Sequence, residues 1–141
     1  MTYWRCFYHL VWGTKRRVPS IDEERADVLM AMIPGIAREE GALVHAIGIM
    51  PDHVHVAISI PPRVSVAQVV SRLKGSTSHR FGHDERSESW FGWQAEYGVM
   101  SLTEKALPTV VDYVRSQPQR HAGQELYLGL EQMEVPYQST Q

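Results

Sequence analysis

The segment at residues 53–60 constrains the fold more than any other part of the chain, because two kinds of side chain alternate along it. Valine or isoleucine occupies positions 54, 56, 58 and 60, whereas His53, His55, Ala57 and Ser59 occupy the positions between them. Successive side chains of a β-strand point to opposite faces, so this pattern predicts a strand with one apolar face and one face that carries both histidines. Two imidazoles in one space often begin a metal site, although a pair of solvated surface histidines is the simpler interpretation.

The neighbouring segments predict an α+β domain with a central, mainly antiparallel sheet and helices packed on it. Apolar or aromatic runs predict further strands over residues 3–12, 43–50 and 90–100, and Pro51-Asp52 predicts a hairpin turn between the second strand and the histidine strand. Capping residues predict helices that begin near Ser20, Ser65 and Ser101, with Pro34 expected to kink the first of them or shift its boundary.

Length and composition indicate one soluble domain. The 141 residues suit a single domain (residues 1–141) with a core over about 3–121, followed by a polar tail over 123–141 to which the sequence assigns no role beyond packing or fraying. The absence of a long apolar run argues against a membrane protein. The single cysteine excludes an internal disulfide and favours a cytoplasmic location. A formal net charge of −2 offers no general attraction to nucleic acid, so such a partner would need local basic clusters.

Several other residues admit two interpretations. His45 is expected to be a satisfied sheet histidine, and the polar stretch from His79 through His83 to Ser89 is expected to be a loop rather than a metal site. Trp90 and Trp93 could stack unpaired bases, although packing is the favoured interpretation.

The last predicted helix carries Tyr113 and Gln117 one turn apart, and therefore on a common face. Pro118 follows Gln117 directly, which predicts that the helix bends or ends there. Taken alone, Tyr113 would be interpreted as a tyrosine at the edge of the core.

Four segments together resemble the single-tyrosine HUH transposases of the insertion sequence 200/605 type. They are Tyr8–Lys15, Met50–His55, the pairs Trp93-Gln94 and Tyr97-Gly98, and Tyr113–Gln117. The resemblance covers roughly residues 3–121, with the segments in the family's order. It implies a ferredoxin-like fold, a C-terminal helix that carries the tyrosine, and homodimers that act on single-stranded DNA and recognise hairpins at the ends of a mobile element.

The resemblance also implies roles for individual residues. Tyr113 would be the nucleophile that forms a 5′-phosphotyrosine, and His53, His55 and Gln117 would bind the metal ion. Mg²⁺ or Mn²⁺ is the implied cofactor, whereas two histidines alone would suggest zinc. The side chains expected to contact DNA are basic, namely Lys15, Arg16, Arg17, Arg72, Lys74 and Arg120.

Two other functions remain open. The first is a DNA-hairpin-binding regulator that keeps the fold without transposing. The second is a zinc-dependent hydrolase, which is disfavoured because no carboxylate ligand or base is apparent nearby; Asp52 adjoins His53 but is expected to point off the other face.

Overall fold

A computed structural model of the chain describes residues 1–82 and 90–135. The elements in chain order are β1 (Phe7–Gly13), the short 3₁₀ helix η1 (Lys15–Arg17), α1 (Glu23–Glu39), β2 (Leu43–Met50), β3 (His53–Ser59), α2 (Val66–Phe81), β4 (Gly98–Leu102), α3 (Leu107–Arg115), α4 (Gln117–Gly123) and α5 (Leu128–Glu131). Within the described residues, no helix is long and apolar enough to cross a bilayer.

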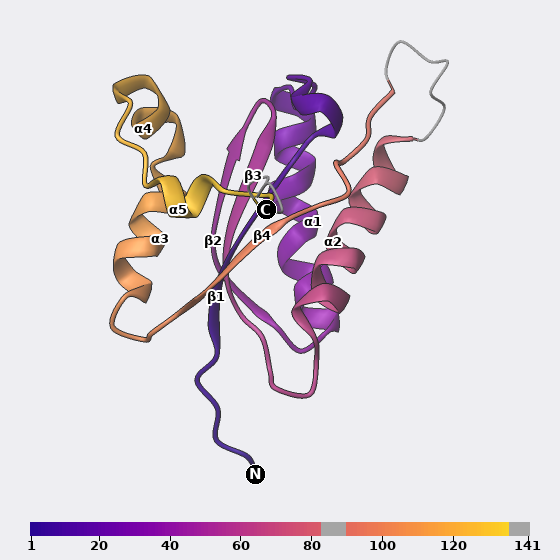
Figure 1. The fold of residues 1–141 in the computed structure, drawn as a ribbon. Helices are drawn as coiled ribbons and strands as arrows, with labels where there is room; N and C mark the ends of the chain where they lie inside the picture. Colours follow the sequence, from indigo (N-terminus) through magenta and orange to yellow (C-terminus); the bar gives the residue numbers. More distant parts are fainter. Residues whose placement is uncertain (83–89, 136–141) are drawn as a thin grey trace, which may run out of the picture.

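The four strands form one antiparallel sheet in the order β2-β3-β1-β4. Helices α1 and α2 cover one side of this sheet, and α3, α4 and α5 lie on the other side (Figure 1). The order β1-α1-β2-β3-α2-β4 with these neighbours is that of a ferredoxin-like fold. The predicted α+β architecture is therefore confirmed.

The two faces of β3 differ as the alternation predicts. Val54, Val56 and Ile58 belong to the main hydrophobic core, which they form with apolar residues of α1 and α2. We call this side of the sheet the scaffold face. His55 and Ala57 point to the opposite side, which we call the histidine face, where Ala57 packs with residues of α3.

Close backbone approach on the histidine face depends on two glycines. A Cβ added to Gly48 of β2 would overlap the carbonyl oxygen of Val114, so α3 lies almost in contact with the strand. A Cβ added to Gly98 of β4 would likewise overlap the carbonyl oxygen of Gln132, just after α5. Small residues at these positions let the C-terminal helices reach the centre of the sheet.

Some predicted boundaries are wrong. Helix α1 has no boundary at Pro34, because buried apolar side chains lie both before the proline, at Leu29 and Ile33, and after it, at Ile36 and Ala37. Residues 90–97 do not continue a strand. Trp93 forms an isolated bridge with Thr14, just after β1, and regular pairing with β1 begins only at Gly98.

The C-terminal half departs from prediction in a similar way. Ser101 belongs to β4, so the helix that carries Tyr113 begins later, at Leu107. It ends at Arg115, and α4 begins at Gln117 with Pro118 in its first turn, which confirms the predicted break. Helix α3 is not the last helix, since α4 and α5 follow it. His79 lies in α2 rather than in a loop, whereas His83 and Ser89 lie outside the described residues.

Candidate active site

The two histidines of β3 lie side by side and are enclosed by protein. His53 and His55 are 2% and 0% exposed, and their ring centroids are 5.0 Å apart. They leave the same face of the strand because one residue separates them. The interpretation as solvated surface histidines is therefore wrong.

Two residues from the C-terminal segments complete a cluster with these histidines. The carboxylate of Glu131 in α5 lies 2.8 Å from Nε2 of His55 and 3.6 Å from Nε2 of His53. It also lies 3.0 Å from Nε2 of His121 in α4. One ligand atom from each of the four residues lies within 4.8 Å of the other three.

The orientation of these groups suits a cation better than a set of hydrogen bonds. Nε2 of His53, Nε2 of His55 and Oε2 of Glu131 are buried, and none of the three has a hydrogen-bond partner, although the last two are only 2.8 Å apart. Buried polar atoms without partners are costly and rare. Imidazole nitrogens and a carboxylate oxygen are also ligands that Zn²⁺ and Mn²⁺ accept. The donor set therefore fits a divalent ion.

The outer ring nitrogens of both histidines are held by other side chains. Nδ1 of His53 lies 2.7 Å from Oδ1 of Asp52, and Nδ1 of His55 lies 2.8 Å from Nε2 of His9 on β1. When Nε2 binds a metal ion, Nδ1 carries the proton and donates to such a partner, which fixes the orientation of the ring. Asp52 thus faces the site, and the expectation that it points away is wrong, because the turn before β3 brings its carboxylate back to the imidazole.

The pKa shifts agree with neutral imidazoles beside a charged carboxylate. Burial lowers the pKa of His55, and burial together with the nearby His55 lowers the pKa of His9 to about 3. Burial by itself would raise the pKa of Glu131, but the imidazoles of His53 and His55 outweigh it and hold that pKa well below its usual range. These shifts favour the deprotonated forms of His55 and Glu131, which are the forms that bind a metal ion.

Tyr113 reaches the same site from α3. Its side chain is fully buried, and its ring meets that of His55 edge-on with centroids 5.9 Å apart. The backbone amide of Tyr127 donates to the Tyr113 hydroxyl at 3.1 Å. The rings of the two tyrosines stack with centroids 4.7 Å apart, and the Arg120 guanidinium lies over both rings. Burial raises the pKa of Tyr113. Within one chain, therefore, the predicted nucleophile lies beside the predicted histidines.

Gln117 is buried one turn after Tyr113, as its spacing predicts. Its side-chain amide donates to the Tyr113 carbonyl at 3.0 Å, and its Oε1 lies 3.0 Å from Nε2 of His121. Oε1 of Gln117, the oxygen expected to bind the metal ion, therefore contacts His121, which is a member of the cluster.

The basic residues named from the sequence are divided among four places. Arg17 contacts Asp52 and lies 3.3 Å from Nδ1 of His53, at the edge of the cluster. Arg120 covers Tyr113. Lys15, Arg16 and Lys74 lie near residues 90–97, whereas Arg72 pairs with Glu39 and Glu40 of α1.

Three residues of the site were not predicted from the sequence, namely His9, His121 and Glu131. His121 follows Gln117 by four residues, a spacing that places both on one helix face and could have indicated it. Glu131 had no comparable signal. It lies in the interval that was assigned no role beyond packing or fraying, yet its carboxylate contacts three histidines.

Comparison with known proteins yields relatives over most of the chain. The family of IS200-like transposases matches residues 2–117. The ISDra2 transposase of Deinococcus radiodurans is 30% identical over 115 residues, which cover 78% of this chain and 82% of that protein. The transposase for insertion sequence element IS200 of Salmonella typhimurium is 26% identical over 143 residues, covering 96% of this chain and 88% of that protein.

Solved structures agree with these relatives. A crystal structure described as a candidate transposase of Deinococcus radiodurans has a TM-score of 0.64 and 27% identity, covering 89% of this chain and 95% of that one. A REP-associated tyrosine transposase bound to a REP hairpin has a TM-score of 0.65, covering 86% of this chain and 74% of that one; at 18% identity it supports the fold alone. The family match contains His53, His55, Tyr113 and Gln117 but ends before His121 and Glu131. The chain belongs to the family of IS200-like transposases.

Proposed function

We propose that this protein cuts and rejoins single-stranded DNA at the ends of a mobile element through a 5′-phosphotyrosine on Tyr113. The observation that best supports this proposal is the meeting of Tyr113 with His53 and His55 in one buried site. A phenol is a weak nucleophile near neutral pH, and burial weakens it further by raising its pKa. It therefore needs an activating partner of the kind that a metal site provides.

His53 and His55 would hold a divalent metal ion, Mg²⁺ or Mn²⁺ by family resemblance. A bound ion would draw charge from a non-bridging phosphate oxygen and orient the phosphodiester for in-line attack. The family resemblance gives the third ligand as Gln117, whereas proximity and charge favour Glu131, with His121 beside it. An anionic oxygen next to two neutral imidazoles would bind a divalent ion more strongly than an amide would.

The chemical step needs no external energy source. The Tyr113 oxygen forms a bond to phosphorus while the bond from phosphorus to the 3′ oxygen breaks. The phenol loses its proton and the departing strand gains one as a 3′-hydroxyl. The new ester resembles the old one in energy, so a second 3′-hydroxyl can reverse the step and join two strands. Such chemistry suits strand exchange better than degradation.

The proposed substrate is single-stranded DNA with hairpin ends, bound by a homodimer. A transposase of similar fold is bound to a REP hairpin, and hairpin recognition is extended to this chain by analogy with it. Arg17 and Arg120 lie at the cluster, where they could neutralise the phosphates that flank the cut. The contact of Tyr113 with the histidine of its own chain supports an arrangement in which one subunit supplies a complete site.

One observation favours the second candidate, a hairpin-binding regulator that does not cut DNA. The Tyr113 hydroxyl is buried and already accepts a hydrogen bond from Tyr127, so it must be uncovered before it can react. The zinc-dependent hydrolase was set aside because no carboxylate was apparent, and Glu131 removes that argument. Formation of a covalent intermediate, read together with DNA cleavage, distinguishes all three.

The decisive experiment is the search for that intermediate. The protein is incubated with labelled single-stranded hairpin DNA and Mn²⁺, and covalent protein–DNA adducts are separated by denaturing electrophoresis. The expected result is an adduct that Tyr113→Phe abolishes and that Tyr3→Phe, at an exposed position, leaves intact. DNA binding without an adduct would favour the regulator. Cleavage without an adduct would favour the hydrolase, and an adduct in Tyr113→Phe would place the nucleophile elsewhere.

A titration identifies the third ligand. Mn²⁺ is titrated by calorimetry into the wild type, Glu131→Gln and Gln117→Ala, with Glu125→Gln as an exposed carboxylate control in the same region. If Glu131 binds the ion, its variant loses the most affinity. If Gln117→Ala loses more, the ligand set implied by the family resemblance is correct.

A further inference from the structure

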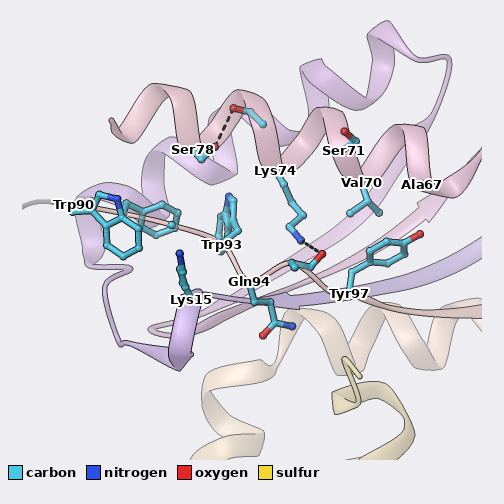
Figure 2. A pocket seen from close by; sticks show the side chains of 14 residues that line it. Lys15, Ala67, Val70, Ser71, Lys74, Ser78, Trp90, Trp93, Gln94 and Tyr97 are labelled. Atoms are coloured by element: carbon cyan, nitrogen blue, oxygen red, sulfur yellow. Dashed lines mark hydrogen bonds between the residues drawn. The ribbon is translucent and has the colours of Figure 1, made fainter. Parts of the chain in front are cut away.

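A second hollow lies apart from the histidine cluster, between α2 and residues 90–97. Its volume is about 690 Å³, and none of the four cluster residues His53, His55, His121 and Glu131 lines it. Four aromatic residues line it, as do two lysines: Trp90, Phe91, Trp93, Tyr97, Lys15 and Lys74. We call this hollow the aromatic cleft. Figure 2 shows Trp90, Trp93 and Tyr97 along the segment that faces α2, with Lys15 approaching from η1 and Lys74 from α2.

The two tryptophans of the cleft differ in how they are held. Nε1 of Trp93 donates to the Thr77 hydroxyl at 2.9 Å, and its ring meets those of Trp12 and Phe91 edge-on. Trp93 is thus a packing residue, as the sequence favoured. Trp90 is only half-buried, and Gly92 provides the space into which its ring fits.

Cations surround the ring of Trp90. Nζ of Lys15 lies 5.6 Å and Cζ of Arg16 lies 5.8 Å from its centroid. Half-exposed aromatic rings beside basic side chains are the arrangement with which proteins hold single-stranded nucleic acids, since each nucleotide offers a base that stacks and a phosphate that attracts a cation.

A polar group also points into the cleft. The Lys74 ammonium donates to the carbonyls of Ala95 and Glu96 at 3.3 and 3.1 Å, and burial lowers its pKa. Gln94 lines the same wall, but its side chain points away from α2 (Figure 2). An ammonium in a cleft with aromatic walls favours a ligand that combines a flat π-face with electron-rich oxygens, as a nucleobase does.

The chain connects the cleft directly to the metal cluster. The Lys15 amide donates to the Gly92 carbonyl at 2.8 Å, and Arg17, two residues later, contacts Asp52 beside His53. The side chains of Arg17 and Gln94 also both reach the sulfur of Met133. Residues 15–17 thus contact both the cleft and the surroundings of the cluster, and a DNA strand that follows η1 could reach both.

We propose that the aromatic cleft binds one unpaired nucleobase of the DNA strand, stacked on Trp90, with its phosphate on Lys15. This inference rests on the proposed function only for the identity of the DNA strand. The binding of a base in the cleft can be tested independently of that function. It assigns recognition of an unstacked base to a site distinct from the metal cluster, and it requires the DNA to be single-stranded at that position.

Binding of labelled (dT)₁₅ to the full chain in EDTA, measured by fluorescence anisotropy, tests the cleft without any cleavage chemistry. Trp90→Ala is expected to weaken binding by about 5- to 150-fold, the range found when one base–aromatic stack is removed. Trp90→Phe keeps a ring and should restore most of the affinity. Trp4→Ala removes a tryptophan outside the cleft and should have little effect. Thermal unfolding of each variant checks that the fold is retained.

A matched oligonucleotide separates base stacking from attraction to phosphates. A 15-mer of abasic residues keeps the charge of (dT)₁₅ and lacks its bases. The wild type should prefer (dT)₁₅, and Trp90→Ala should lose much of that preference while its affinity for the abasic strand changes little. An unchanged preference in folded Trp90→Ala would overturn the proposal, as would an equal loss for both strands.

The adduct assay with Tyr113 keeps this test separate from that of the proposed function. An adduct together with no effect of Trp90→Ala on base preference would reject the cleft alone. The predicted base preference without any adduct would support the cleft and reject the strand-transfer chemistry.

Discussion

The two faces of the sheet are equally buried at β3 but differ in chemistry. All seven residues of this strand are buried, whether they point to the scaffold face or to the histidine face. On the scaffold face, Val54, Val56 and Ile58 pack among apolar side chains of two long helices. On the histidine face, three shorter helices bring polar and charged groups against His53 and His55. Burial alone therefore does not distinguish structural from functional positions here.

The faces differ in how many buried polar atoms lack hydrogen-bond partners. Among the described residues of the scaffold-face core this is Nε1 of Trp12, whereas on the histidine face Nε2 of His53, Nε2 of His55 and Oε2 of Glu131 all lack partners. An unsatisfied buried polar group costs about 1–3 kcal/mol. The histidine face thus gives up stability that the scaffold face must supply, and a bound ion would recover part of it.

The largest effect on folding should come from the scaffold face. Ile58→Ala removes a fully buried side chain and should lower the free energy of unfolding by about 2–5 kcal/mol, because it loses apolar burial and leaves a cavity. Urea denaturation measures this loss. Leu43→Ala, at a 56% exposed position of β2, is the control and should change little. If the two variants were equally destabilised, the scaffold face would not be the main source of stability.

On the histidine face, the close approach of α3 can be disrupted by one methyl group. Gly48→Ala places a Cβ against the carbonyl oxygen of Val114, so α3 must move away from β2. We expect a loss of about 1–3 kcal/mol in the free energy of unfolding, typical of overpacking, together with weaker adduct formation because Tyr113 shifts with the helix.

Gly75→Ala in α2 is the matched control for this substitution. No other group lies within 4 Å of the added Cβ, and alanine favours a helix more than glycine does, so this variant should be as stable as the wild type or more stable. If Gly48→Ala behaved in the same way, the contact between α3 and β2 would be looser than the structure describes.

The difference between the faces also explains what the sequence could predict. A β-strand has a fixed alternation, so the placement of His53 and His55 on one face and of Val54, Val56 and Ile58 on the other followed from the spacing alone. Tyr113 and Gln117 share a helix face for an equally local reason. Their meeting with the histidines was implied by family resemblance and not by any local rule.

The residues that were missed depend on contacts between distant segments. His9 reaches His55 only because β1 pairs with β3, and Glu131 reaches the cluster only because Gly98 lets the chain after α5 cross β4. Neither contact follows from the composition of the segment that carries it. A polar stretch after the last strong apolar stripe resembles a fraying tail until its tertiary position is known.

A smaller effect on the histidine face is expected from Asp52, whose carboxylate contacts Nδ1 of His53. Asp52→Asn removes the charge that orients the imidazole, and loss of such a partner typically weakens metal binding about 10- to 100-fold. Calorimetric titration with Mn²⁺ measures the change, and Asp27→Asn, at an exposed position on α1, is the control. Equal affinities for both variants would mean that Asp52 does not support a metal ligand.

The smallest expected effect returns to the scaffold face. The Ser65 hydroxyl caps α2 by accepting a hydrogen bond from the backbone N–H of Gln68 at 3.0 Å. Ser65→Ala should therefore lower the free energy of unfolding by about 1 kcal/mol. Ser76→Ala, inside the same helix, keeps the cap and is the control. Because α2 does not contribute to the cluster, Mn²⁺ affinity should stay unchanged in both variants. A weaker Mn²⁺ affinity in Ser65→Ala would show that the two faces are coupled through the sheet and not independent.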